Sequence, residues 1–383
     1  MIGRPRHLAA IRALLRAFPV VAILGPRQSG KSTLAREIAE EYGGSTVFDL
    51  EDPATAQAFV EPGLMLRARR GLVVLDEIQH APALFPLLRV LADRPGAPAR
   101  FLVLGSASPE LLRQGSESLA GRIAWYELDG FALDEVADSG LLHVRGGLPP
   151  SVLAADDAAA AQWRDHYVRS LLARDLPQLG LGLSPPAARR FWVMLAHIHG
   201  RVLNVSELAR AFAMGDHAAR RTIDLFEHAL LVRTVQPWFA NVAKRQVKAP
   251  KIYIADSGIL HSLLGLDGAD AVGSHPGVGS SWEGFALAQV AARLGLPRER
   301  CWFWGTHGGA ELDLYVEVGG RRLGFEFKRT ERPTTTKSMH VAMADLQLDR
   351  LLVVHAGTLS FPLAPGIDAI ALDRIWSDLD AQP

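Results

Sequence analysis

Residues 25–32 have the sequence GPRQSGKS and match the pattern Gly-x-x-x-x-Gly-Lys-Ser/Thr of a phosphate-binding loop, or P-loop. An apolar run, Val20–Leu24, precedes the loop, and a helical pattern, Ser32–Glu41, follows it, which is the context that the pattern requires. The N–H groups of such a loop surround phosphate oxygens, and the positive end of the helix adds to the attraction. The stretch therefore predicts a nucleotide-binding α/β fold, with a chance glycine-rich turn before a helix as the alternative.

The side chains of this loop suit ATP and Mg²⁺. Lys31 is expected to place its charge on the β- and γ-phosphates, and Ser32 to offer its hydroxyl to Mg²⁺. The pattern predicts nucleotide contacts from Gly25, Gln28, Ser29, Gly30, Lys31 and Ser32.

A second acidic motif follows the P-loop by about 45 residues. The apolar run Leu72–Leu75 has the pattern of a buried strand and ends in Asp76 and Glu77. We expect Asp76 to hold the Mg²⁺ shell and Glu77 to polarise the attacking water. An ordinary solvated strand end is the alternative.

Two further residues are candidates for contact with the nucleotide. Ser106 follows an apolar strand pattern, Phe101–Leu104, and is a candidate sensor of the γ-phosphate. A serine after a strand is also common turn chemistry. Arg122 is a candidate arginine finger, although a surface or structural role is an equal alternative in a chain with 35 arginines.

The chain of 383 residues has no formal net charge and is 49% hydrophobic and 21% charged, which excludes a disordered protein. Its one cysteine, Cys301, excludes a disulfide scaffold or a Cys-rich zinc site and fits a reducing compartment, so we expect a cytoplasmic protein. No apolar run approaches the roughly 18 residues that span a bilayer.

Strand patterns alternate with helical patterns up to about Phe131, which predicts a parallel sheet with helices on both faces. A helical stretch follows and closes at Ser184–Pro186, which has the composition of a linker. The domains expected are an ATPase core (1–131), a helical lid or linker (132–185), a winged helix (186–264), a second linker (265–280) and a C-terminal α/β domain (281–383).

The middle of the chain combines three helical patterns with two strand patterns, Leu231–Val235 and Lys251–Ile254, as in a winged helix-turn-helix. Ser206 is the expected N-cap of the second helix. Residues 186–260 carry eleven basic and five acidic side chains, including Arg220 and Arg221 on the third helix and Lys244, Lys248 and Lys251 beside the expected wing. This excess favours contact with DNA phosphates, and a packing or oligomerisation module is the alternative.

The C-terminal segment carries a second set of acidic residues. Asp313 and the Glu326-x-Lys328 pair lie on two strand patterns joined by a Gly319-Gly320 hairpin turn. Glu326 and Lys328 share one face of their strand, and the hairpin can bring Asp313 to that face. Asp313 and Glu326 can then bind Mg²⁺, Lys328 can orient a water, and Glu283 in the preceding helix can complete the site. An amphipathic hairpin with exposed charges is the alternative.

Three groups of motifs occur in this order: the P-loop with Leu75–Glu77, then Asn204–Ala209 with Val247–Gly258, then Glu311–Asp313 with Glu326–Lys328. In this combination the chain resembles a large prokaryotic family of AAA-type P-loop ATPases with a C-terminal domain of unknown function. In that family the C-terminal region looks like a winged helix followed by a restriction-endonuclease-like PD-(D/E)xK domain.

The resemblance implies ATP binding through Gly30, Lys31, Ser32 and Thr33, with Asp76 and Glu77 at the metal and the water. It also implies that Asp313, Glu326 and Lys328 match the nuclease motif, with Glu283 in the helix position.

These patterns leave three functions open. The first is an ATP-driven DNA-processing enzyme whose C-terminal domain is a nuclease dependent on Mg²⁺ or Mn²⁺. The second is a regulatory ATPase in which nucleotide switches the binding of DNA or a partner protein and the nuclease fold is inactive. The third is a signalling ATPase without a nucleic-acid role. Whether the chain forms an oligomeric ring is also open, and no histidine spacing predicts zinc.

Overall fold

The computed structural model describes residues 2–96, 99–106, 115, 117–239 and 246–379. The chain forms two compact units: unit 1 contains residues 1–130 and 228–230, and unit 2 contains residues 131–227 and 231–383. The segments after residue 131 that we expected as separate domains therefore belong to one unit.

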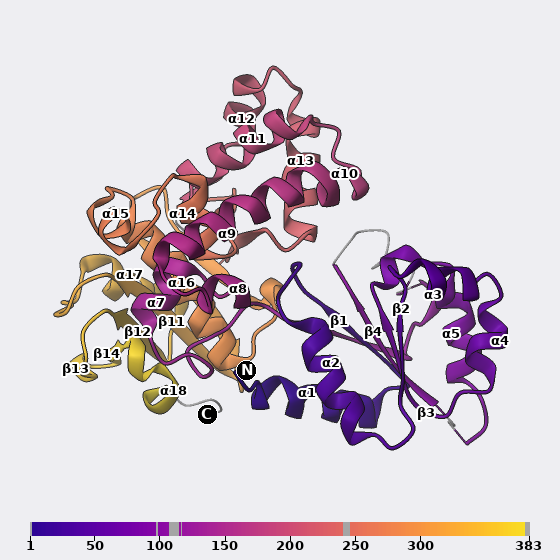
Figure 1. Cartoon of the computed structure of the whole chain (residues 1–383). Helices are drawn as coiled ribbons and strands as arrows, with labels where there is room; N and C mark the ends of the chain where they lie inside the picture. The colour runs from indigo at the N-terminus through magenta and orange to yellow at the C-terminus, as the bar shows by residue number, and fades with distance from the viewer. Residues whose placement is uncertain (1, 97–98, 107–114, 116, 240–245, 380–383) are drawn as a thin grey trace. The chain divides into compact units, whose positions relative to one another are not determined.

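Unit 1 is built on a five-stranded parallel sheet with the strand order β2-β3-β4-β1-β5 (Figure 1). The strands are β1 (Val20–Leu24), β2 (Thr46–Asp49), β3 (Gly71–Asp76), β4 (Ala99–Gly105) and β5 (Ile123–Glu127). All five residues of β1 are buried, because helices cover both faces of the sheet. The predicted parallel α/β sheet is confirmed.

The two faces of this sheet form separate apolar clusters. Helices α1 (Pro5–Ala17) and α2 (Lys31–Glu41) pack on one face. Helices α4 (Pro62–Arg67) and α5 (Leu84–Ala92) pack on the other face. The short helix α3 (Pro53–Ala58) precedes them in sequence and has no buried residue. Alternate residues of β1 point to opposite faces, so Val21 and Ile23 join the first cluster and Val20 and Ala22 the second.

Unit 2 begins with helices. These are α7 (Ser139–Arg145), α8 (Pro149–Val152), α9 (Asp157–Ser170) with its π-helical extension (Leu171–Asp175), α10 (Leu176–Gln178) and α11 (Pro185–His197). The predicted linker at Ser184–Pro186 is wrong. Ser184 is the N-cap of α11 and the two prolines occupy its first turn, where their missing N–H groups have no helical partner to lose.

The segment after α11 has the element order β6 (Arg201–Val202), α12 (Val205–Ala211), α13 (Asp216–His228), β7 (Val232–Pro237) and β8 (Lys251–Ile254). Strand β8 lies between β6 and β7 and is antiparallel to both. Ser206 is not the N-cap of α12. Asn204 takes that position, and its side chain accepts a hydrogen bond of 3.2 Å from the N–H of Glu207.

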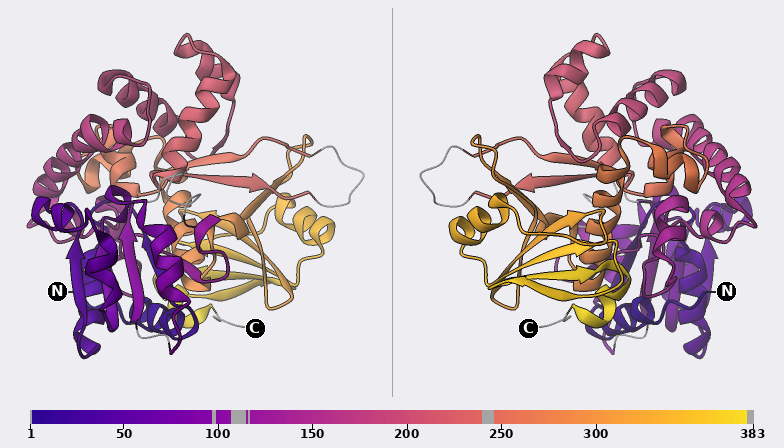
Figure 2. Two further views of the ribbon diagram at one scale, coloured as in Figure 1. Left: turned by 90° about the vertical axis from the view of Figure 1, so that its right-hand side faces the viewer. Right: turned by 90° about the vertical axis from the view of Figure 1, so that its left-hand side faces the viewer.

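These three strands continue into a nine-stranded sheet with the order β13-β14-β12-β11-β10-β9-β7-β8-β6, because β7 also pairs with β9. The orange and yellow strands of unit 2 lie side by side in Figure 2. The remaining strands are β9 (Trp302–Gly305), β10 (Glu311–Val318), β11 (Arg321–Lys328), β12 (Arg350–His355), β13 (Phe361–Ala364) and β14 (Ile367–Ala371). The β10–β11 hairpin turns at Gly319 and Gly320, as predicted.

Helices complete unit 2. They are α14 (Ser257–Leu263), α15 (Ala269–Ser274), α16 (Val278–Leu294), α17 (Lys337–Leu346) and α18 (Ile375–Asp378). Helix α16 contacts β11, and α17 packs on β10, β11 and β12. Because α15 lies within residues 265–280, that segment is not the simple linker that its composition predicts. None of the helices in the described residues combines the length and the apolar character that crossing a bilayer requires.

Candidate functional site

The P-loop connects β1 to α2 and has a conformation that needs glycine at both ends. Gly30 has a φ of 94°, in the left-handed region that side chains disfavour. A Cβ atom at Gly25 would lie 2.3 Å from the carbonyl oxygen of Leu128, which is too close for any other residue. Gln28 also has a positive φ, 61°, which marks a strained turn at the tip of the loop.

Lys31 is buried at the start of α2, with 5% of its surface exposed. Its Nζ atom donates hydrogen bonds to the carbonyl oxygens of Gly25 (3.0 Å) and Pro26 (2.9 Å), within its own loop. Burial lowers the pKa of Lys31, and Glu77 and Asp76 oppose that shift. The ammonium group is thus positioned by its own loop and remains available to a bound phosphate.

Asp76 is the last residue of β3 and Glu77 follows it, at the sheet edge where the P-loop lies. The hydroxyl of Ser32 bonds to the Asp76 side chain, and burial raises the pKa of Asp76. The N–H of Glu77 donates to Asp76 Oδ1 (3.0 Å), and the amide of Gln79 donates to the Glu77 carboxylate. In P-loop ATPases a serine or threonine hydroxyl and an aspartate hold the Mg²⁺ ion that also contacts the nucleotide phosphates. The adjacent side chains of Ser32 and Asp76 fit that ion.

The structure separates the two remaining nucleotide candidates. Ser106 directly follows β4, whose last residue pairs with Leu24 just before the P-loop, so Ser106 lies at the nucleotide end of the sheet. Arg122 precedes β5 and its carbonyl bonds to Val20, at the opposite end of the sheet. Its guanidinium pairs with both oxygens of Asp93 (2.6 and 2.9 Å). Arg122 is therefore not part of the nucleotide site of its own chain.

One residue near the P-loop was missed by sequence reasoning. Arg4, buried in front of α1, donates hydrogen bonds to the carbonyl oxygens of Ser29 (3.0 Å), Asp129 (3.2 Å) and Gly130 (3.0 Å). It therefore ties the P-loop to the segment that leaves β5. No motif predicted this role, because its partners are backbone atoms distant in sequence.

The predicted acidic residues of unit 2 lie on three neighbouring elements. Asp313 on β10 accepts a 3.1 Å hydrogen bond from the N–H of Phe327 on β11. Glu326 and Lys328 share one face of β11, and Lys328 Nζ lies 2.7 Å from Glu326 Oε1. Glu283 comes from α16. We call these residues, with Glu311, Lys251 and Tyr253 described next, the acidic cluster.

Lys251 and Tyr253 on β8 complete the acidic cluster. Lys251 is 4% exposed, and its Nζ atom lies 3.3 Å from Glu283 Oε1 and 3.3 Å from Asp313 Oδ1. It also forms an ion pair with Glu311. The Tyr253 hydroxyl donates to Glu283 Oε1 (2.7 Å). The sequence places Lys251 in a basic wing, whereas the structure buries it among carboxylates. No motif predicts the position of Tyr253.

The ionisation of the acidic cluster reflects its burial. Burial, reinforced by the charge of Asp313, raises the pKa of Glu283 and of Glu326 to about 7. Burial opposes the charge of Lys251, but the surrounding tyrosine and carboxylates raise its pKa well above the usual value. Lys251 therefore remains a cation while two of its neighbours can take up protons near neutral pH.

We expected Asp313 and Glu326 to bind Mg²⁺ or Mn²⁺, and the arrangement does not fit that expectation. Within the described residues, no three His, Cys, Asp or Glu side chains are placed to hold a metal ion together. Asp313 directs one oxygen to Lys251 and the other to a backbone N–H. The Lys251 ammonium lies where the carboxylates of Asp313, Glu283 and Glu311 converge, so a divalent cation there would meet a positive charge.

Three stretches of the chain match known protein families, one mostly in unit 1 and two in unit 2. Residues 17–137 match a family described as "AAA domain". Residues 139–270 and 278–375 match two families described as domains of unknown function, DUF8612 and DUF4143.

Two curated proteins are similar over nearly the whole chain. They are "Uncharacterized protein Rv2008c" of Mycobacterium tuberculosis and "Uncharacterized protein Mb2031c" of Mycobacterium bovis. Each is 47% identical over 377 residues, which cover 98% of this chain and 85% of the relative. The chain belongs to their family. Its first unit is an AAA-type P-loop ATPase domain, and the protein is an ATPase.

A solved structure supports the fold. The Walker-type ATPase PABY2304 of Pyrococcus abyssi aligns with a TM-score of 0.50 and 15% identity, over 69% of this chain and 96% of that protein. This likeness concerns the fold alone.

The basic residues of the middle segment divide into two groups. Among the described residues of 186–260, six basic side chains are exposed, namely Arg189, Arg190, Arg201, Arg210, Arg221 and Lys248, against two exposed acidic ones, Glu207 and Asp216. We expected Lys251 and Arg233 to contribute to a basic surface, but both side chains are buried. Lys244 and Arg245 lie outside the described residues. The exposed positive charge thus lies mainly on α11, α12 and α13.

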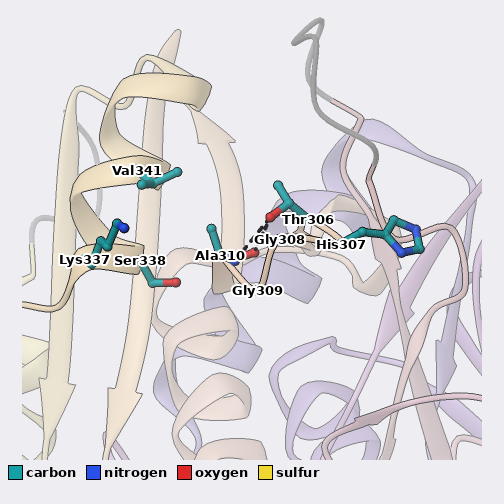
Figure 3. A pocket seen from close by; sticks show the side chains of 8 residues that line it. All are labelled: Thr306, His307, Gly308, Gly309, Ala310, Lys337, Ser338 and Val341. Atoms are coloured by element: carbon teal, nitrogen blue, oxygen red, sulfur yellow. Dashed lines mark hydrogen bonds between the residues drawn. The ribbon is translucent and has the colours of Figure 1, made fainter.

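A pocket of about 470 Å³ lies between the β9–β10 turn (306–310) and the start of α17. Figure 3 shows His307 and Lys337 on opposite sides of it. The hydroxyl of Ser338, which also lines the pocket, accepts a 2.9 Å hydrogen bond from the N–H of Glu311. None of the residues of the acidic cluster lines this pocket, although the hydrogen bond from Glu311 to Ser338 makes the two features adjacent.

Proposed function

We propose that this ATPase is a nucleotide-switched nucleic-acid-binding protein. Unit 1 binds and hydrolyses ATP with Mg²⁺, and unit 2 binds DNA phosphates through the exposed faces of α11, α12 and α13. The observation that carries this proposal is the charge imbalance over the described residues of 186–260, in a chain without net charge. Six exposed basic side chains, four of them on α11, α12 and α13, stand there against two exposed acidic ones.

The order of elements in this segment supports the proposal. The sequence α11, β6, α12, α13, β7, β8, with β8 between β6 and β7, is the order of a winged helix-turn-helix. In such a module the helix in the position of α13 enters the major groove. That helix carries Arg221, which is exposed, and Arg220, which pairs with Asp224. Arginine contacts to phosphate would give affinity that depends on salt and little on sequence.

A nuclease dependent on Mg²⁺ or Mn²⁺ and coupled to the ATPase is the competing function. Asp313, Glu326 and Lys328 lie close together on two adjacent strands and match the expected motif, which favours this function. The position of Lys251 between Asp313 and Glu283 argues against it. A fold can persist after its chemistry is lost, and we assign unit 2 to binding for this reason.

The test measures DNA binding by fluorescence anisotropy, with single- and double-stranded DNA, at several salt concentrations, with and without ATP and Mg²⁺. We expect affinity to fall as salt rises and to differ between the nucleotide-free and ATP-bound protein. Reversing two exposed charges, with Arg210→Glu and Arg221→Glu, should weaken binding about tenfold or more. The matched control reverses two exposed arginines elsewhere in unit 2, with Arg321→Glu and Arg332→Glu, and should not.

Two outcomes would contradict the proposal. Absence of any salt-dependent DNA interaction would remove the nucleic-acid function and favour a protein partner. DNA cleavage by the wild type that is lost in Asp313→Ala would establish the nuclease instead. Lys31→Ala tests the switch separately, because its DNA affinity should no longer respond to ATP.

A further inference from the structure

The acidic cluster is completed by a residue from outside the expected nuclease motif. Lys251 belongs to β8, and its ammonium group lies 3.3 Å from carboxylate oxygens of both Glu283 and Asp313 and pairs with Glu311. These carboxylates come from α16 and β10. Side chains with hard oxygen atoms converge on one point in this way when they bind a divalent cation. In this protein the ammonium group of Lys251 occupies that position.

The hydrogen-bond partners of the cluster show how little is left for a metal. Asp313 Oδ2 accepts from the N–H of Phe327, and Glu283 Oε1 accepts from Tyr253 as well as from Lys251. Glu326 Oε1 accepts from Lys328, while Glu326 Oε2 is buried without a hydrogen-bond partner in the described structure. The other carboxylate oxygens named here would each have to give up a hydrogen bond to ligate Mg²⁺, which in proteins uses one or two carboxylates and completes its shell with water.

Lys251 is also held firmly in place. Its strand lies between β6 and β7, with Lys251 opposite Val202 on one side and Val235 on the other. Its ammonium lies 5.7 Å from the centre of the Phe303 ring. Withdrawing the side chain would leave buried carboxylates without their partner, and moving the strand would break its pairing with β6 and β7.

We propose that Lys251 is a built-in cation that replaces a divalent metal in the acidic cluster. In the native protein the cluster then does not bind Mg²⁺ or Mn²⁺, and it becomes open to a divalent ion only when this ammonium is removed. Lys251 and Tyr253 thereby account for the Lys-x-Tyr part of the segment after Pro250. This inference concerns metal binding alone and holds whether or not unit 2 binds DNA.

The test is a titration of the nucleotide-free, full-length protein with Mn²⁺, followed by electron paramagnetic resonance of the free ion. The wild type and Asp313→Asn should bind Mn²⁺ equally, because the cluster of the wild type holds none. Lys251→Met should gain one site at least about tenfold tighter than any in the wild type, because a like charge at contact distance is lost. Adding Asp313→Asn to Lys251→Met should abolish that site, and Lys251→Arg, which retains the cation, should not gain it.

Melting temperature provides a second measurement in case Lys251→Met is poorly folded. Mn²⁺ should raise the melting temperature of Lys251→Met and not that of the wild type, since a bound ion replaces the lost cation. If Lys251→Met does not fold even with Mn²⁺, the wild type and Asp313→Asn alone decide the matter, because equal Mn²⁺ binding by both supports the proposal.

Three results would overturn it. They are Mn²⁺ binding by the wild type that Asp313→Asn abolishes, a folded Lys251→Met without a new site, and an equal gain in Lys328→Met. The last would mean that total charge, rather than the position of Lys251, excludes the metal. DNA anisotropy on the same proteins is independent, so a failure of the proposed DNA binding would leave the Mn²⁺ result unchanged.

Discussion

Lys31 in unit 1 and Lys251 in unit 2 are both buried lysines close to two or more carboxylates. Lys31 donates to two carbonyl oxygens of its own loop, and the hydroxyl of Ser32 bonds to Asp76. Lys251 instead pairs directly with carboxylates from α16 and β10. Among the described residues, Lys31 has no direct carboxylate partner and can therefore bind a phosphate, whereas Lys251 neutralises carboxylates of the protein itself. The same residue types therefore do not imply the same chemistry.

If this comparison is correct, removing the first lysine should affect activity most. We expect Lys31→Ala to lower the rate of ATP hydrolysis about 100-fold or more, because its charge stabilises the transferring phosphoryl group. Phosphate release at saturating ATP measures the rate. Arg36→Ala, on an exposed position of the same helix, is the control and should hydrolyse ATP normally. A normal rate in Lys31→Ala would show that the P-loop is not the catalytic site.

Glu77→Gln provides a sharper form of that experiment. We expect it to retain ATP binding and to lose hydrolysis, since Glu77 is assigned to the attacking water rather than to the phosphates. ATP binding can be followed by the shift in melting temperature. If Glu77→Gln hydrolyses ATP at the wild-type rate, the water must be activated elsewhere.

The second lysine should matter for stability rather than for ATP hydrolysis. Lys251→Met removes one partner of a buried ionic cluster, which typically costs about 3–5 kcal/mol of unfolding free energy. Lys328→Met should cost about 1 kcal/mol or less, because 39% of the Lys328 side chain is exposed. Tryptophan fluorescence during urea unfolding reports mainly on unit 2, which contains every tryptophan except Trp125. Equal effects of the two variants would contradict the internal-cation interpretation.

A smaller effect is expected from pH, which should change the unfolding free energy of unit 2 through its buried glutamates. Glu283 and Glu326 have a pKa of about 7 in the folded protein, above the ordinary value of 4.5, so the folded state holds their protons more tightly than the unfolded chain. The stability that this provides is fully present below about pH 4.5 and is lost progressively as pH rises from there through about 7. We expect the unfolding free energy of unit 2 to fall by on the order of 1 kcal/mol between about pH 6.5 and 8.

Below that range the buried histidines act in the opposite direction. Burial lowers the pKa of His143 and His199 to about 3 and of His261 to about 4, so the unfolded chain binds their protons first and stability falls as pH drops below about 6.5. Urea unfolding across pH measures both effects. Glu283→Gln with Glu326→Gln should flatten the fall above pH 6.5, and the exposed control Glu331→Gln should not. An unchanged profile in the double variant would refute the assignment.

The two sites also differed in how well they could be predicted from the sequence. The P-loop and the Asp76–Glu77 pair depend on short-range patterns, and their positions at the ends of β1 and β3 followed from them. Lys251 could not be placed, because its partners Glu283 and Asp313 are 32 and 62 residues away and meet it only across the sheet. The strand Lys251–Ile254 has the predicted bounds and pairs with β7 as the two-stranded wing predicts, but its pairing with β6 could not be predicted.

The errors in the fold have similar causes. The strand β5 was missed because Ile123–Glu127 mixes apolar and polar residues at the edge of a sheet, where one side needs no partner strand. The prolines at the start of α11 suggested a linker because Pro-rich composition fits both a loop and a first helical turn. In each case local composition was compatible with two structures, and tertiary packing decided between them.

Arg122 should have the smallest effect of all. It pairs with Asp93 at the end of the sheet away from the P-loop, so Arg122→Ala should not change ATP hydrolysis by the isolated chain. An arginine at this position can act only on the nucleotide of a neighbouring copy. Measuring the hydrolysis rate per chain over a wide range of protein concentration tests this, with Arg16→Ala, another exposed arginine of unit 1, as the control. A rate that rises with concentration in the wild type and not in Arg122→Ala would show that copies of the chain complete each other's sites. A flat and equal rate in all three proteins would leave the ATPase site of unit 1 complete within one chain.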